Sequence, residues 1–251
     1  MRRLLLNYMK LPKKIYPDNI KDSIVEIRYT PKLPFEIALG FFFQALDDTY
    51  IFANRQVLPF TLPDGRNLEI SQGSVSLFHN ENIKFEIRAN SIVFNCIADY
   101  KGWDIYDAQI RKAMVQLLAS DMIVSVDRVG VRYISEYPNE ELINFTKFKF
   151  TFGFPDIKSN SYNFRCDFEL LGKQVALNLN NNSNVSPQIT NMQNIDLSQI
   201  SSIDVDIIAD NKCNHDIDSL MAIVNECHDL EKDIFFGMLD EKYFNNLKKE
   251  F

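Results

Sequence analysis

Four arginines lie in segments whose alternating apolar and polar residues predict β-strands, and their chemistry suits the binding of an anion. They are Arg28, Arg88, Arg128 and Arg132. A guanidinium group donates paired hydrogen bonds to phosphate or carboxylate oxygens. If the four side chains converge on one concave face, they would bind a small anionic ligand such as a nucleotide, or an acidic partner.

The same arginines have carboxylates nearby, which favours a structural role. Arg28 and Arg88 are each the last residue of a short motif, E-I-R. In this motif Glu26 and Glu86 precede the arginines by two residues and therefore lie on the same strand face. Cross-strand ion pairs would let these charges line a sheet with little penalty. A half-buried arginine usually finds a carboxylate in its own chain, so internal pairing is the favoured interpretation.

A pair of aspartates offers a second kind of chemistry. Asp204 and Asp206 alternate in I-D-V-D-I-I and therefore share one strand face. Together with Asp210 or Asp216 they could coordinate magnesium, as in nucleases and phosphodiesterases. The same pattern is typical of a half-exposed strand, and nothing nearby supplies the lysine of a typical nuclease motif. The structural interpretation is again favoured.

Thiols and imidazoles near the end of the chain give a weak zinc hypothesis. Cys213 and His215 precede a predicted helix that carries Cys227 and His228, and zinc prefers such ligands. Adjacent residues on a helix point about 100° apart, so Cys227 and His228 are poorly placed to bind the same ion. A capping loop and a partly buried helical histidine are the favoured alternative.

Other catalytic signatures are missing from the sequence. It contains no Walker A motif, no G-x-G-x-x-G, no H-E-x-x-H and no G-x-S-x-G. With 8 glycines in the whole chain, a glycine-rich phosphate cradle is not expected, and none of the three histidines stands in a recognisable nucleophile context. We therefore predict no catalytic residue and no cofactor, and favour a non-catalytic role over an enzyme.

Charge and cysteine usage narrow the class of protein. The net charge is −7 and the isoelectric point is near 5.1, which disfavours nucleic acid as a partner. The apolar run of MRRLLLNYMKLPKK is too short for a secretory signal, and no stretch approaches the roughly 18 apolar residues of a membrane span. The four cysteines are widely spaced in the sequence. We therefore expect them to be reduced thiols in a cytoplasm.

The elements that would position these residues follow from periodicity. Residues 35–48, 103–121 and 216–251 have helical patterns, the last as one helix or two joined near Gly237 and Asp240. Strands are predicted at 23–30, 50–57, 67–72, 74–80, 83–89, 91–98, 123–137, 147–154, 163–170, 173–181 and 201–210. Residues 178–194, rich in asparagine, are predicted to form a surface loop.

The order of these elements predicts an α+β fold, with mostly antiparallel sheet covered by helices. Strands followed by a helix occur in the middle and at the end of the chain. We expect two related strand-rich halves, an N-terminal α+β half over residues 1–120 and a C-terminal α+β half over 121–251, which could also form one continuous domain. In DRVGVRYISEY, Gly130 marks an expected bulge or close approach.

Several short words together resemble a sporadically distributed bacterial family of uncharacterised proteins. They are I-V-E-I-R-Y, R-V-G-V-R-Y-I, I-D-V-D, and a closing helix with Cys-His-Asp followed by Phe-Phe. In that family the first two look like V-E-x-x-F-E-I-R-F and R-L-G-L-R-Y-I-N, and the similarity spans Asp22 to about Phe244. Ser135 and Glu136 stand here where the family often has asparagine.

The resemblance implies no activity, because the family has no established one. Its patchy occurrence suggests genes that move horizontally, as those of phage defence and mobile elements do. We therefore expect a cytoplasmic, non-catalytic interaction or sensor module with a protein partner, acting in antiviral defence or another mobile system. The alternatives are a metal-dependent nuclease or phosphodiesterase, and a binding protein for a small anionic ligand. The sequence does not specify an oligomeric state.

Overall fold

The computed structural model describes residues 11–55, 60–61, 67–68, 75–96, 100–149, 161–184, 199–210 and 216–251. The strands are β1 Lys14–Tyr16, β2 Ile20–Pro31, β3 Ile51–Arg55, β4 Phe60–Thr61, β5 Asn67–Leu68, β6 Val75–His79, β7 Ile83–Ile87, β8 Ser91–Cys96, β9 Ile123–Pro138, β10 Tyr162–Leu170, β11 Lys173–Asn184, β12 Gln199–Ala209 and β13 Lys248–Glu250. The helices are α1 Phe35–Leu46, α2 Trp103–Ala119, α3 Leu142–Phe145, α4 Ile217–Met238 and α5 Glu241–Asn246, with a 3₁₀ turn at Asp47–Thr49.

Nine of the strands form one sheet in the order β10-β11-β12-β9-β2-β8-β7-β6-β3. Neighbouring strands such as β10 and β11, β2 and β8, and β7 and β8 run antiparallel. Two further two-stranded sheets pair β1 with β13 and β4 with β5. Helices pack against the large sheet, so the predicted α+β class with mostly antiparallel strands is confirmed.

The chain divides into two compact units built from discontinuous stretches. Unit 1 contains residues 1–23, 130–209 and 223–251, and unit 2 contains residues 24–129 and 210–222. β2, β9 and α4 each contribute residues to both units. The division into halves at residue 120 stays a prediction, and each unit is considered separately below.

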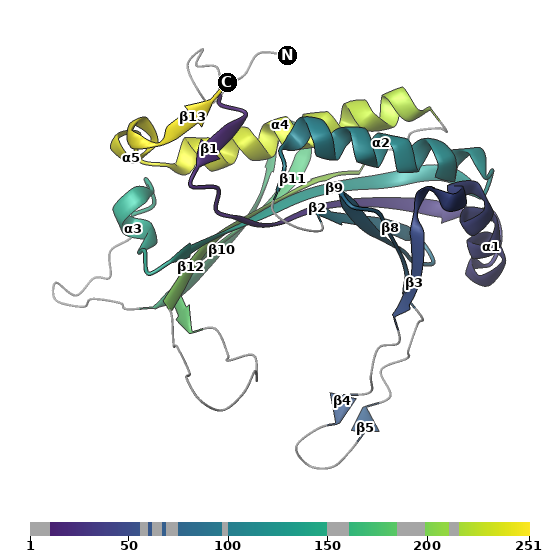
Figure 1. Cartoon of the computed structure of the whole chain (residues 1–251). Coiled ribbons are helices and arrows are strands. Elements are labelled where there is room, and N and C mark those ends of the chain that lie inside the picture. Colours follow the sequence, from purple (N-terminus) through teal and green to yellow (C-terminus); the bar gives the residue numbers. More distant parts are fainter. Residues whose placement is uncertain are drawn as a thin grey trace. The chain divides into compact units, whose positions relative to one another are not determined.

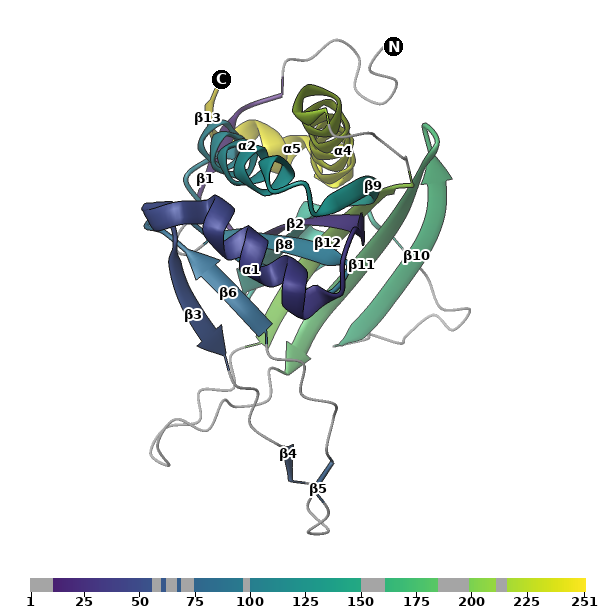
Figure 2. The ribbon, with the colours of Figure 1, turned by 90° about the vertical axis from the view of Figure 1, so that its right-hand side faces the viewer.

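Unit 2 owes its core to the strict alternation of β2, β7 and β8. Their inward residues are buried aliphatic and aromatic side chains: Val25, Ile27, Tyr29, Ile83, Phe85, Ile87, Ile92 and Phe94. α1 and α2 lie over this face (Figure 2). The edge-on contact of Phe42 of α1 with Tyr29, at 6.0 Å between ring centroids, joins helix to sheet. The opposite face carries Glu26, Arg28 and Glu86 beside the apolar Val93.

Unit 1 buries the face of β12 that carries Ile203, Val205 and Ile207. α4 lies along this side of the strands in Figure 1, and α3 and α5 close one end. The ring of His228 on α4 lies 5.6 Å from that of Tyr133 on β9. α3 and α5 are joined through Phe145, whose ring is 5.1 Å from that of Tyr243. Aromatic residues thus fill the space between the sheet and its helices.

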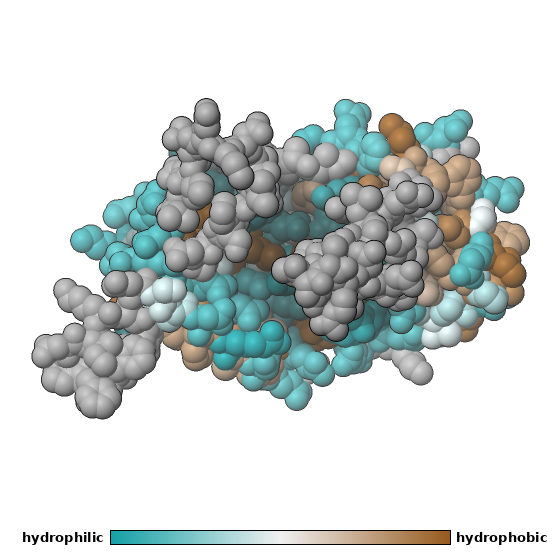
Figure 3. Space-filling model, turned by 90° about the horizontal axis from the view of Figure 1, so that it is seen from below, coloured by the Kyte–Doolittle hydropathy of each residue, from teal (hydrophilic) through white to brown (hydrophobic). Residues whose placement is uncertain are grey.

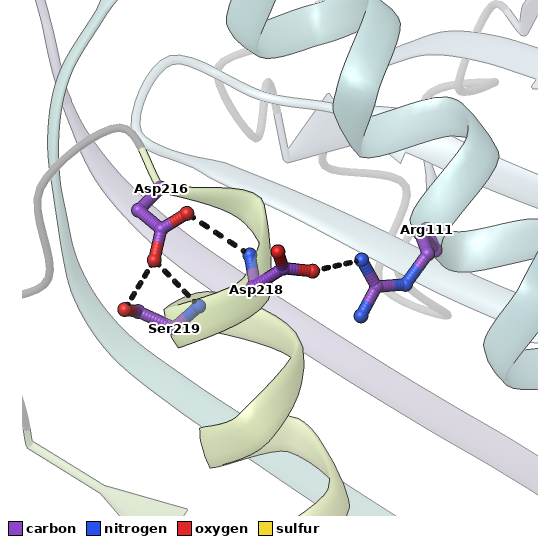
Figure 4. Close-up of polar contacts among 4 residues, drawn as sticks. All are labelled: Arg111, Asp216, Asp218 and Ser219. Carbon is purple, nitrogen blue, oxygen red and sulfur yellow. Dashed lines mark hydrogen bonds and ion pairs between the residues drawn. The ribbon is translucent and has the colours of Figure 1, made fainter.

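The start of α4 is capped by a carboxylate (Figure 4). Asp216 accepts hydrogen bonds from the backbone N–H of Asp218 (3.3 Å) and Ser219 (2.9 Å) and from the hydroxyl of Ser219. The bond from the Ser219 hydroxyl has the largest effect, followed by the two backbone bonds, and together they lower the pKa of the Asp216 carboxyl. Asp218 in turn accepts from Arg111 of α2 at 2.6 Å. This contact ties the two helices together within unit 2.

Three predicted elements differ from the structure. The last helix was predicted to run to residue 251, but residues 248–250 form the strand β13. The asparagine-rich segment is not a loop from Asn178 onward, because β11 continues to Asn184. Asn178 and Asn180 alternate on one strand face and pair with Asp204 and Ser202 of β12. Lys147–Lys149 were predicted to begin a strand and do not.

Within the described residues, no helix is both long and apolar enough to cross a membrane.

Candidate functional site

The two E-I-R segments lie level with each other in unit 2, on either side of β8. Glu26 of β2 and Glu86 of β7 both stand opposite Val93 of β8, so the three residues form one row across three strands. They occupy the face that α1 and α2 leave uncovered, and Figure 3 shows that the coloured residues on this side are largely hydrophilic. The repeated word is therefore a repeated position in the sheet.

Each arginine of these words is bound by its own glutamate. Arg88 donates to the carboxylate of Glu86 from Nη2 at 2.7 Å and from Nε at 3.3 Å. Arg28 Nε lies 3.2 Å from Glu26 Oε2. The pairs form along one strand rather than across strands, and both arginine side chains are about half exposed. Such exposed pairs contribute little stability.

Arg132 of β9 forms the most buried of the four arginine contacts. Its Nε and Nη2 each donate to one carboxylate oxygen of Asp204, both at 2.8 Å, and Asp204 is buried. Asn178 Nδ2 of β11 adds a third hydrogen bond to Asp204 at 3.0 Å. The bond to Asp204 raises the pKa of Arg132, so the guanidinium group stays charged at any physiological pH.

Arg128 of β9 is held more loosely. Its Nε lies 3.9 Å from Asp210 Oδ1, and that nitrogen is buried without a hydrogen-bond acceptor among the described residues. In β9, Val129, Gly130 and Val131 are buried in succession. The bulge or close approach expected at Gly130 stays a prediction.

All four predicted arginines therefore have a carboxylate of this chain beside them. Three of these contacts are hydrogen-bonded or close ion pairs, and the fourth is the looser pair of Arg128. These contacts support the structural interpretation of the arginines. An anion site formed by Arg28, Arg88, Arg128 and Arg132 stays a prediction without a contact that favours it.

The predicted magnesium ligands have different surroundings. Both carboxylate oxygens of Asp204 already accept hydrogen bonds, from Arg132 and Asn178. A metal ion would have to displace the arginine. Asp206 lies two residues further along the same strand face. Among the described residues, no group of three or more histidine, cysteine, aspartate and glutamate side chains could hold a metal ion.

The zinc hypothesis gains no support from the described part of the chain. Cys213 and His215 lie outside the described residues. Cys227 is fully buried in α4, and burial raises the pKa of its thiol to about 12. A neutral, enclosed thiol is a poor metal ligand because zinc binds the thiolate.

Sequence reasoning missed one buried acid. Glu231 of α4 is almost completely enclosed, and burial raises the pKa of its carboxyl to about 8. At neutral pH this carboxyl is therefore mostly protonated. The helical periodicity around Glu231 places it on the buried stripe with Cys227 and Ile234, and that signal could have identified it.

An exposed apolar surface lies on α1 and the end strand β3. Phe43 is 53% exposed and Phe52 is 40% exposed, and their rings meet edge-on at 5.5 Å. Ile37 and Phe41, one helical turn apart, are exposed on the other flank of the buried stripe of α1. Figure 3 shows hydrophobic residues gathered at the end where Figure 1 draws α1. We call these four residues the α1 surface.

A hollow of about 300 Å³ lies in unit 1, between α4, α5 and the residues just before β1. Leu11, Phe236, Leu239 and Phe244 line it together with the charged Lys147. Lys147 Nζ donates to the carbonyl of Gly237 at 3.2 Å. The volume of this hollow is at the lower limit of sites for small ligands.

No protein-family model matches this chain, and no curated protein is similar to it at a significant level.

Proposed function

We propose that this protein is a non-catalytic interaction module that binds a partner protein through the α1 surface. The observation that supports the proposal is the composition of α1, FEIALGFFFQAL, in relation to what it buries. A helix on the surface of a folded domain needs an apolar stripe about 100° wide. The apolar side chains of α1 cover a much wider arc, and only Ala38, Phe42 and Leu46 are buried.

The exposed apolar residues of α1 continue onto the sheet, which distinguishes them from isolated surface side chains. Phe43 contacts both Phe52 of β3 and Phe78 of β6, at 5.5 and 6.3 Å between ring centroids. Aromatic side chains of this kind are enriched in the centres of protein interfaces. An exposed pair of aromatic rings in contact with a buried one, such as Phe43 and Phe52 with Phe78, is typical of a docking site.

The charges around the α1 surface indicate the chemistry of its partner. Glu36 on α1 and Asp48 just after it are exposed, and α1 contains no basic residue. A partner segment with apolar side chains at its centre and lysine or arginine at its rim would complement both features. A place for this module in phage defence or a mobile element stays a prediction from the family resemblance.

The test compares partner binding by matched variants. Tagged wild-type protein is purified from its own cells, the stoichiometric partner is identified, and both proteins are purified separately and recombined. We expect Phe43→Asp to weaken this binary binding at least about tenfold, because a charge replaces an aromatic anchor. Phe251→Asp, at an exposed aromatic residue of unit 1, is the matched control and should bind as the wild type does.

Two results would contradict the proposal. One is equal affinity of the wild type and Phe43→Asp for the purified partner. The other is turnover of a nucleotide or nucleic acid by the pure protein that an Asp204→Ala substitution abolishes, because that result would support the nuclease alternative instead.

A further inference from the structure

The strand β10 ends the large sheet, and none of its residues is buried. One face carries Tyr162, Phe164, Cys166, Phe168 and Leu170, and the other carries Asn163, Arg165, Asp167 and Glu169. Phe164 and Phe168 are 37% and 38% exposed although they lie on the apolar face of the sheet. In the described part of the chain, no strand pairs with the outer edge of β10.

This edge lacks most of the usual protections against pairing with another strand. Natural edge strands are commonly short or carry charged residues, especially lysine, or proline or a bulge. The charged residues of β10 all lie on one face. β10 has nine residues without lysine or proline, and all nine pair with β11 in an unbroken register. A long, regular edge with an apolar face is a template for a further strand.

The turn of the hairpin fixes which backbone groups face outward. Leu171 and Gly172 both have positive φ, 52° and 71°, as in a two-residue type I′ turn. The flanking residues Leu170 and Lys173 are then a hydrogen-bonded pair, and bonded residues alternate along the strand. Arg165 and Asp167 accordingly present their backbone N–H and C=O groups to the open edge.

The sequence of β10 is complementary to itself about Cys166. If a second β10 runs antiparallel with its Cys166 opposite the first, Arg165 faces Asp167 of the second copy, and Phe164 faces Phe168. Each contact then occurs twice, once from each copy, with opposite charges paired on one face of the strands and aromatic rings paired on the other. Registers moved by two residues lose this match, because Asp167 then faces Asp167 of the second copy, or Arg165 faces Arg165.

We propose that two copies of this chain associate through β10, with their strands antiparallel and centred on Cys166, so that the two large sheets join across a twofold axis. A second copy is the occupant that the observations favour, because only a strand of the same sequence reproduces the charge and ring complementarity in both halves. The α1 surface lies in unit 2 and β10 in unit 1, so the inference does not depend on the proposed function.

Charge exchange tests the register. In monomeric protein, Arg165 and Asp167 bind each other at 2.9 and 3.0 Å. Arg165→Asp or Asp167→Arg alone would place like charges opposite each other twice in the dimer. We expect either substitution to raise the dimer dissociation constant at least about tenfold in sedimentation equilibrium. Arg165→Asp combined with Asp167→Arg should restore it, because each acid again faces a base.

Arg88→Asp is the matched control, since Arg88 also binds a glutamate two residues earlier, but directly after the interior strand β7. It should leave the dissociation constant unchanged. A wild-type protein that stays monomeric over a wide concentration range would overturn the proposal. So would a dimer that tolerates both single substitutions, or one that the double exchange does not restore.

Cross-linking provides a second measurement that does not depend on the charged variants. Cys166 has a free, partly exposed thiol, and in the proposed register it occupies a non-bonded position. The Cα atoms of such a pair lie about 4.5 Å apart, within the range of disulfides. Diamide takes up the two electrons and two protons released as the disulfide forms. We expect a covalent dimer from the wild type and from Cys96→Ser, but none from Cys166→Ser. Equal cross-linking of all three proteins would contradict the register.

Discussion

Asp204 is the residue at which a metal site and an ion pair give opposite predictions. Asp204→Ala removes the acceptor of Arg132 and Asn178, so we expect the free energy of unfolding to fall by about 2–4 kcal/mol. Glu86→Ala, which breaks the exposed pair with Arg88, should lower it by less than about 1 kcal/mol. Urea denaturation measures both. A magnesium-dependent rise in the melting temperature that Asp204→Ala abolishes would instead support a metal site.

Glu231 gives the protein a stability that depends on pH. Burial raises the pKa of its carboxyl from 4.5 to about 8, so the unfolded chain ionises this group at a lower pH than the folded chain does. Unfolding therefore releases a proton between these two pH values, and the free energy of unfolding falls as the pH rises, by about 1.4 kcal/mol per pH unit. Below the lower value the contribution is fully present.

Glu231→Gln preserves the size of the side chain and removes its ionisation. We expect urea denaturation to show that the stability of the wild type relative to this variant falls by several kcal/mol between about pH 5 and pH 8. Parallel pH profiles for the two proteins would mean that the carboxyl is ionised in the folded protein, and would contradict the burial argument.

Local patterns could predict the residues of the candidate sites but not the contacts that decide their roles. The spacing in E-I-R predicted that Glu26 and Arg28 share a strand face, and they form an ion pair. The contact between Arg132 and Asp204 joins residues far apart in the chain. It depends on which strands become neighbours, and that order is set by the packing of the whole sheet.

At the scale of elements, the turn between β10 and β11 contains a strained residue whose substitution should relieve the strain. Leu171 adopts a positive φ of 52°, which is unfavourable for a leucine and common for asparagine in a type I′ turn. Leu171→Asn should therefore raise the free energy of unfolding by about 1 kcal/mol, since the leucine side chain is largely exposed. Gly172→Ala, at a φ of 71°, should lower it by a similar amount. Stabilisation by Gly172→Ala would contradict the assigned turn.

Periodicity predicted the elements well where one face is buried. The alternation of SIVEIRYT indicated β2, and the 3.6-residue pattern after Trp103 indicated α2. The first part of the asparagine-rich segment, residues 178–184, was interpreted wrongly because alternation was sought in apolar residues. The rest of the predicted loop lies outside the described residues. In β11, Asn178 and Asn180 form the polar half of that alternation, and Leu177 and Leu179 form the apolar half.

At the scale of the whole molecule, the two proposed surfaces belong to different units of the chain. The α1 surface is formed by residues of unit 2, and β10 belongs to unit 1. Substitutions at sites that share no contacts usually act independently. Partner binding and self-association should therefore be separable by mutation.

We expect Arg165→Asp to weaken self-association while the binary affinity for the purified partner stays within about twofold of the wild type. Phe43→Asp should do the reverse, with the dimer preserved and partner binding reduced. Sedimentation equilibrium and calorimetric titration on the same protein samples measure both properties. If Arg165→Asp weakened both, the partner would bind only the dimer, and the assignment of partner binding to unit 2 alone would be wrong.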